Sequence, residues 1–462
     1  MRVTRAQRVL LVAIIVTFVA FLDGAVINVA LPAMREDLGG GLALQQWVVD
    51  GYLITLGAFI LIAGSLSDSF GRMRIMRIGL YGFGATSLLC AVAPTALVLV
   101  IARILQGAAG ALLVPSSLAL IISTFAPSEQ GKAIGKWTAW TTAAFVVGPL
   151  VGGMLVDAAS WRLIFAINVL PIAIALWLLA GLGTDAPNPA RPRIDVVGAV
   201  LGVLGLGGPV FALIEQGRLG WSSPAIYLPF VLGIACFAAF LWWENRCDDP
   251  MMPLEMFTVR NFGMGNIATV FIYAAFTFGP FALTVFLQEV GGYTALAAGV
   301  ATLPAVVLLI LLASWFGARA DRIGPRLFMT VGPLVCAVGF LLTLTMTSEA
   351  AYWTQVLPGI SVFGLGMAIT VAPLTTAILG AVDPARAGIG SAINNAVARV
   401  AGLIAVACTG IIVGSALDLN GYLRAAMVTA ALLVVGGLVS LAGIRNPTLT
   451  GAESAVPAEP AP

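Results

Sequence analysis

The sequence contains no histidine, and only 10 % of its 462 residues are charged. A soluble domain carries about 25 % charged residues, because it must cover a water-facing surface. We therefore exclude a soluble globular enzyme and a disordered chain. Without histidine, the chain also lacks the commonest metal ligand and the usual proton carrier at neutral pH. We expect no metal site and no cofactor.

The sequence also has few cysteines and no large excess of either charge. Five cysteines lie far apart without a CxxC pair, so neither a disulfide framework nor a zinc site is predicted. The chain has 23 basic and 21 acidic residues. This near balance argues against nucleic acid or another polyanion as a partner.

Apolar residues, by contrast, make up 60 % of the chain. A helix that crosses a membrane needs about 20 mostly apolar residues. The sequence supplies fourteen such stretches, at residues 9–33, 44–66, 76–93, 96–122, 134–157, 163–182, 196–216, 224–243, 262–288, 297–318, 327–346, 352–379, 388–414 and 422–444. We predict an all-α integral membrane protein whose outer surface contacts the lipids of the membrane.

The basic residues predict the orientation of these helices. If the N-terminus is cytoplasmic, 17 arginines and lysines fall in cytoplasmic segments and four fall outside. Positive charge is enriched on the cytoplasmic side of membrane proteins, so both termini are expected there. Arginine far outnumbers lysine, 21 to 2, which hints at a GC-rich bacterial genome and an inner (cytoplasmic) membrane.

A short motif occurs twice and reveals a repeat. Residues 64–74 read GSLSDSFGRMR after the second stretch, and residues 317–326 read GARADRIGPR after the tenth. Repeated halves are typical of secondary transporters. The repeat pairs the second helix with the tenth, so two extra helices must lie between two six-helix bundles. We expect bundles at 1–182 and 261–445, a linker with two helices at 183–260, and a disordered tail at 446–462.

Several segments, taken in order, resemble the major facilitator superfamily, and in particular its fourteen-helix drug:proton antiporter branch. They are LDGAVINVALP at 22–32, GSLSDSFGRMR at 64–74, RILQGAAGA at 103–111, GPLVGG at 148–153 and FLQEVGGYTALAAGVATLP at 286–304. The resemblance covers about residues 7–445 and implies the major facilitator fold, most often as a monomer. It places gating motifs at Gly64, Asp68, Gly71, Arg72, Gly148, Pro149, Gly152, Gly153, Asp321 and Arg322.

Few charges remain inside the predicted membrane spans. Asp23 lies near the middle of the first span, Asp50 in the second and Arg103 in the fourth. A carboxylate in this environment is a functional candidate, and without histidine it is the expected proton carrier. We therefore assign proton coupling to Asp23, Asp50 and Arg103, while a permanent structural Asp–Arg pair is the alternative. Glu215 and Glu289 lie near outer helix ends, where solvated or interfacial positions are expected.

Polar stripes on otherwise apolar helices predict the walls of a substrate cavity, because such stripes should avoid lipid. The predicted lining residues are Gln106, Thr142, Asn266, Tyr273, Thr277, Phe281, Thr284, Gln288, Asn394, Asn395 and Arg399. Arg399 either binds an anionic group or anchors its helix. Mixed aromatic and weakly polar walls suit amphipathic organic molecules.

These features together predict a function. No phosphate-binding loop of the GxxxxGK[ST] type occurs, so an ion gradient is the expected driving force. We predict proton-coupled efflux of hydrophobic or amphipathic compounds by alternating access. The alternative is export of an endogenous lipid or secondary metabolite with loose or no proton coupling. An integral-membrane enzyme is not expected, because no nucleophile, metal or acid–base cluster is present.

Overall fold

The computed structural model describes residues 4–182, 195–248, 250–383, 386–414 and 417–446, without the side chains of Leu61, Ser65, Asp68, Pro127, Ser128 and Ala387. Most of the predicted linker stretch 183–195 and the tail beyond residue 446 therefore lie outside the described residues. Every regular element in the described ranges is helical.

The helices follow the predicted spans closely. They are α1 Arg5–Leu38, α2 Gly41–Phe70, α3 Arg72–Ala91, α4 Ala96–Ala111, α5 Leu113–Thr124, α6 Pro127–Ala158, α7 Leu163–Ala166, α8 Val169–Ala180, α9 Val196–Leu219, α10 Pro224–Glu244, η1 Leu254–Thr258, α11 Arg260–Glu289, α12 Ala295–Ile323, α13 Pro325–Leu342, η2 Thr343–Thr345, η3 Tyr352–Val356, α14 Leu357–Leu379, α15 Ala387–Ala407, α16 Thr409–Val413 and α17 Leu419–Gly443. Three predicted spans are each divided into two α-helices, namely α4–α5, α7–α8 and α15–α16.

Twelve helical stretches in the described part of the chain are long and apolar enough to cross a membrane. The protein is thus a multi-pass membrane protein. Helices α2 and α3 are not among the twelve, so the predicted number of fourteen stays a prediction.

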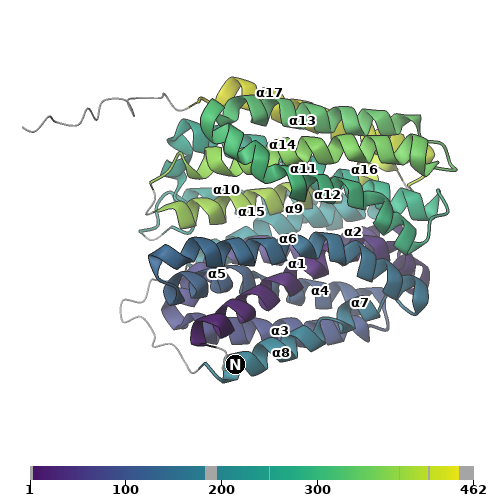
Figure 1. Ribbon diagram of the computed structural model, residues 1–462. Helices are drawn as coiled ribbons and strands as arrows, with labels where there is room; N and C mark the ends of the chain where they lie inside the picture. Colours follow the sequence, from purple (N-terminus) through teal and green to yellow (C-terminus); the bar gives the residue numbers. More distant parts are fainter. Residues whose placement is uncertain (1–3, 183–194, 249, 384–385, 415–416, 447–462) are drawn as a thin grey trace, which may run out of the picture.

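The helices run roughly side by side in two groups (Figure 1). Helices α1–α8 form the lower group in this view and α11–α17 the upper group, with α9 and α10 packed against each other. Contacts of α6 with α12, α2 with α15 and α1 with α11 join the groups. We call the end of the molecule where α1 is followed by α2 the α1–α2 end.

Small residues allow helices to approach closely where the interior is polar. A Cβ atom added at Gly107 on α4 would lie 2.1 Å from the backbone oxygen of Tyr52 on α2. Only glycine permits this separation, because it has no Cβ. This contact brings α2 and α4 together beside the buried charges described below.

The sequence repeat is also a structural repeat. Gly71 lies between α2 and α3 with φ 94°, and Gly324 lies between α12 and α13 with φ 97°. Positive φ favours glycine, because other residues are strained there. The two copies of the motif therefore form the same tight turn between consecutive helices.

Candidate functional site

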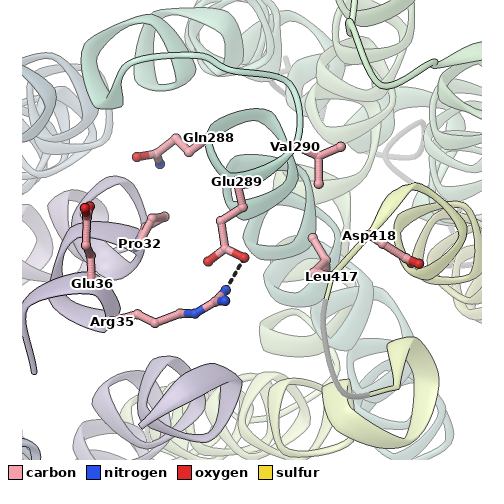
Figure 2. A pocket seen from close by; sticks show the side chains of 8 residues that line it. All are labelled: Pro32, Arg35, Glu36, Gln288, Glu289, Val290, Leu417 and Asp418. Atoms are coloured by element: carbon pink, nitrogen blue, oxygen red, sulfur yellow. Dashed lines mark hydrogen bonds and ion pairs between the residues drawn. The ribbon is translucent and has the colours of Figure 1, made fainter. Parts of the chain in front are cut away.

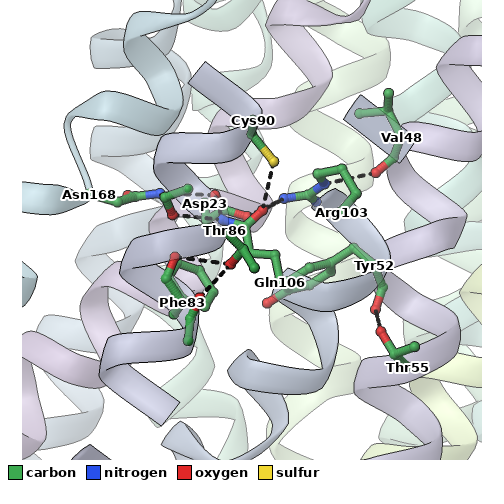
Figure 3. A network of polar contacts seen from close by, with 12 residues as sticks. Asp23, Val48, Tyr52, Thr55, Phe83, Thr86, Cys90, Arg103, Gln106 and Asn168 are labelled. Carbon is green, nitrogen blue, oxygen red and sulfur yellow. Dashed lines mark hydrogen bonds and ion pairs between the residues drawn. The ribbon is translucent and has the colours of Figure 1, made fainter. Parts of the chain in front are cut away.

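An ion pair lies in the interior of the first group of helices. Arg103 Nη1 on α4 donates to Asp23 Oδ2 on α1 at 2.6 Å, and each side chain is only 1 % exposed. Figure 3 shows the side chains of Asp23 and Arg103 pointing toward each other between the helices. The Asp–Arg pair that the sequence analysis considered is therefore present. It holds α1 against α4, because separating the helices would leave each buried charge without its partner.

Amide and hydroxyl groups complete this network. Gln106 Nε2 and Asn168 Nδ2 both donate to Asp23 Oδ1 at 3.0 Å, and Gln106 Oε1 accepts from Arg103 Nη1 at 2.8 Å. Ser87 Oγ accepts from Gln106 Nε2 at 2.9 Å. Gln106, predicted as a cavity residue, is therefore fully buried and engaged with the ion pair. Sequence reasoning missed Ser87 and Asn168, whose only signal was a polar residue within an apolar stretch.

Arg103 also contacts α2. Its Nε donates to the backbone oxygen of Val48 at 2.9 Å, and its guanidinium carbon lies 4.4 Å from the centre of the Tyr52 ring. A guanidinium offers five N–H donors in a fixed plane, so one side chain can join several helices. Any change in the Asp23–Arg103 pair will therefore act on α1, α2 and α4 together.

Asp50 is separate from this network. Its side chain is fully buried on α2, and neither carboxylate oxygen has a hydrogen-bond partner among the described residues. Gln46, one turn earlier, donates its amide to the backbone oxygens of Val406 and Ala407 on α15, both at 2.9 Å. Asp50 therefore lies on the part of α2 that meets the second group of helices.

The predicted polar stripes of α11 and α15 meet at one interface. Asn394 Nδ2 donates to Asn266 Oδ1 at 3.2 Å and to Thr269 Oγ1 at 3.0 Å. One residue further on, Asn395 is exposed and donates only to its own helix, at the backbone oxygen of Ser391. Asn266 is thus a packing residue here, whereas Asn395 faces open space.

The remaining predicted cavity residues are divided between different environments. Tyr273 and Thr277 on α11 are partly exposed, and so is Thr142 on α6. Phe281 and Thr284 are buried in the core of the second group. The structure therefore does not bring all members of the α11 stripe to one surface.

Gln288, also predicted for the cavity, lies instead at the α1–α2 end. It lines a cavity of about 530 Å³ together with Glu289 and Arg35 (Figure 2). Glu289 forms an ion pair with Arg35 of α1 and accepts from Gln45 Nε2 of α2 at 2.7 Å. The sequence favoured a solvated or interfacial Glu289. Its carboxylate, only 16 % exposed, joins the two groups of helices instead.

The GPLVGG segment makes a second connection between the groups. A Cβ atom added at Gly148 or Gly152 would lie 2.6 or 2.3 Å from side-chain atoms of α1, and one at Gly153 would lie 2.4 Å from Leu296 Cα of α12. The backbone oxygen of Pro149 would lie 2.6 Å from a Cβ added at Gly299 of α12. Helix α6 is therefore fitted between α1 and α12 by glycines on two of its faces.

Asp157 lies one turn further along α6. Its two carboxylate oxygens accept from the backbone N–H groups of Ala295 and Leu296, at 3.0 and 2.9 Å. These are the first N–H groups of α12, where a negative charge is favoured. This contact joins the groups at the same end as the Glu289 ion pair.

At the opposite end, the repeated motifs lie at the turns between α2 and α3 and between α12 and α13. Asp321 and Arg322 are exposed. Arg72 Nη1 donates to the backbone oxygen of Ala119 at 3.2 Å. Gly64 lies within α2, and the Asp68 side chain is outside the described part of the chain.

Comparison with known proteins agrees with this architecture. The sequence profile of the Major Facilitator Superfamily matches residues 13–406. The chain is 33 % identical to the methylenomycin A resistance protein of Bacillus subtilis over 94 % of this chain and 92 % of that protein. It is also 33 % identical to the tetracenomycin C resistance and export protein of Streptomyces glaucescens, over 88 % and 75 % of the two chains. The crystal structure of the peptide transporter POT in complex with sulfate has the same fold, with a TM-score of 0.72 at 16 % identity over 94 % of each chain. The chain belongs to the major facilitator superfamily.

Proposed function

We propose that the protein exports amphipathic organic compounds across the bacterial cytoplasmic membrane in exchange for protons. Two relatives are named for resistance to an antibiotic, and one of them also for export, which supports efflux as the direction of transport. The observation that carries proton coupling is the buried ion pair of Asp23 and Arg103, because its carboxylate can exist with or without a proton.

Protonation of Asp23 would remove the charge that balances Arg103. A buried ion pair that loses one charge is destabilised by about 3–5 kcal/mol. Because Arg103 also contacts Val48 and Tyr52, this free energy is available to shift α1 and α4 relative to α2. Asp50 is a second candidate proton carrier, because an unpaired buried charge is costly.

Transport would follow alternating access between two bundles, residues 1–182 and 261–445, with residues 183–260 between them. We assign the α1–α2 end to the outer face, with both termini cytoplasmic. The Glu289 and Asp157 contacts then close the outer side of the inward-facing state. The motifs around Asp68 and Asp321 would close the inner side in the outward-facing state.

We also propose fourteen membrane-crossing helices in a monomeric protein. Helices α2 and α3 have 30 and 20 residues, which is long enough to span a bilayer. Both lie alongside the other helices in Figure 1.

A second candidate function is export of an endogenous lipid or secondary metabolite with loose coupling. One relative favours this second function, because it is named both for resistance to tetracenomycin C and for its export.

The test uses the full-length protein in vesicles with an imposed pH gradient and a panel of cationic, neutral and anionic fluorescent compounds. A pH-sensitive dye in the lumen measures proton movement evoked by each compound. We expect compound-dependent proton flux and uphill transport in the wild type, and loss of both in Asp23→Asn. Asp195→Asn is the matched control, because Asp195 is a buried carboxylate at the start of α9, bound to Trp243. Uphill transport by Asp23→Asn would refute the coupling role, and transport without proton flux would favour the second candidate function.

A further inference from the structure

Arg399 on α15 is a cation inside the membrane region without a counter-charge. It makes no hydrogen bond and no ion pair with any residue that the structure describes. Two carboxylates are buried on the helices of the first group: Asp23 is bound to Arg103, and the oxygens of Asp50 have no hydrogen-bond partner among the described residues. Arginine cannot lose its proton in a protein, so this charge is permanent.

The surroundings of Arg399 are aromatic and lie between the two groups of helices. Its guanidinium carbon is 5.7 Å from the centre of the Phe21 ring of α1. Helix α11 is also close, since a Cβ added at Gly402, one turn further along α15, would lie 2.5 Å from Thr277 Oγ1. The backbone of α2 is close as well, since a Cβ added at Gly57 would lie 3.8 Å from Arg399 Cβ.

The position is open rather than packed shut. Arg399 is partly exposed, and Asn395, one turn earlier on the same face of α15, is exposed. An isolated cation at this depth is costly, so a functional arginine there normally meets an anion or water. Because Asp23 is already paired with Arg103, Arg399 brings to this space a positive charge that no described carboxylate pairs with.

We propose that Arg399 is the anion-binding group of the substrate site, so that the exporter favours amphipathic aromatic compounds carrying a carboxylate or phenolate. This proposal deepens the function proposed above and rests on it. The aromatic ring of Phe21 would contact the apolar body of the compound, while Arg399 binds the anionic group. A guanidinium suits a carboxylate because it can donate two parallel hydrogen bonds.

The test compares two dyes built on the same xanthene ring system, anionic fluorescein and the cationic methyl ester of tetramethylrhodamine. Fluorescence anisotropy measures the Kd of each for the detergent-solubilised full-length protein. The variants are Arg399→Gln, Arg399→Lys and a control, Arg246→Gln, which removes an equal charge from an arginine stacked on Trp242 at the end of α10.

We expect Arg399→Gln to weaken fluorescein binding at least about tenfold, because a hydrogen bond to a charged group is lost. Affinity for the rhodamine ester should stay constant or increase, Arg399→Lys should retain much of the fluorescein affinity, and Arg246→Gln should match the wild type. An equal loss for both dyes would mean that Arg399 only anchors its helix, and would overturn the proposal.

Two further outcomes would overturn it. One is wild-type protein that binds neither dye, or binds fluorescein no better than Arg399→Gln does. The other is displacement of fluorescein by phosphatidylglycerol, which would make a lipid phosphate the natural anion. In each of these cases, compound-dependent proton flux in the vesicle assay would leave the efflux function standing.

Discussion

Removing the charge of Glu289 should open the α1–α2 end of the protein. The change Glu289→Gln keeps the size of the side chain and its contact with Gln45, but it removes the ion pair with Arg35. The Arg35 and Glu289 side chains are 37 % and 16 % exposed, so solvent screens the pair partly. Exposed pairs contribute about 0.2–1 kcal/mol, whereas hydrogen bonds to charged groups contribute about 1.5–3 kcal/mol.

An intermediate loss of about 1–2 kcal/mol is therefore expected, which lowers the ratio of closed to open molecules about 5- to 30-fold. Spin labels at Pro94→Cys and Ser348→Cys report this change, because both positions are exposed at the α1–α2 end, one in each group of helices. Pulsed electron paramagnetic resonance then gives the distribution of distances. The partly exposed native cysteines are first replaced by serine; they are Cys236, Cys247 and Cys408.

The matched control is Glu215→Gln. Glu215 accepts from Trp47 and Arg218 at the same end, but these contacts lie between α2 and α9 or within α9. The labelled distance should lengthen in Glu289→Gln and stay unchanged in Glu215→Gln. An unchanged distribution in Glu289→Gln, or an equal shift in both variants, would refute the assignment of Glu289 to closure.

Three other substitutions test the buried ion pair, the contact of α6 with α12 and the turn at Gly324. Asp23→Asn leaves Arg103 buried without a counter-charge, so thermal unfolding in detergent should show a free energy of unfolding lower by about 3–5 kcal/mol. Adding Arg103→Gln should recover most of this stability, and an unchanged stability of Asp23→Asn would contradict a tight pair. Gly153→Val should hold α6 and α12 apart and lengthen the same spin-label distance, because its Cβ would lie 2.4 Å from a backbone atom of α12. Gly324→Ala should cost about 1–2 kcal/mol at φ +97°, whereas helical Gly202→Ala, with open space around it, should be neutral or stabilising; equal unfolding temperatures would argue against strain at Gly324.

The helices were largely predictable from the sequence. Each apolar stretch of about 20 residues became a helix or a pair of helices, because an apolar segment in lipid must satisfy its backbone hydrogen bonds internally. The repeated glycine motif likewise predicted two equivalent turns, at Gly71 and Gly324. The division at Leu112 has a local cause that the span count did not use: Pro115 cannot donate a backbone hydrogen bond to residue 111, four positions earlier. The division at Cys408 has no such proline.

The site was predictable only in part. Scarcity of charge was enough to predict that Asp23 and Arg103 lie inside the first group of helices, because charged residues within membrane spans are rare and normally face the bundle interior. Ser87 and Asn168 were missed, since a hydroxyl or amide in an apolar stretch has no meaning until the helices around it are placed. The sequence pattern predicts one surface for the α11 stripe, but Asn266, Thr284 and Gln288 meet three different environments, because their neighbours come from other helices.

Composition and local periodicity were enough to predict that this protein is helical, spans a membrane many times and keeps very few charges inside it. Which of those charges meet depends on how the helices pack. Packing pairs Asp23 with Arg103 and Glu289 with Arg35, and it gives Arg399 no ion-pair partner among the residues that the structure describes. The two ion pairs join residues that are 80 and 254 positions apart in the chain. No local sequence pattern shows which residues that far apart will lie together in the folded protein.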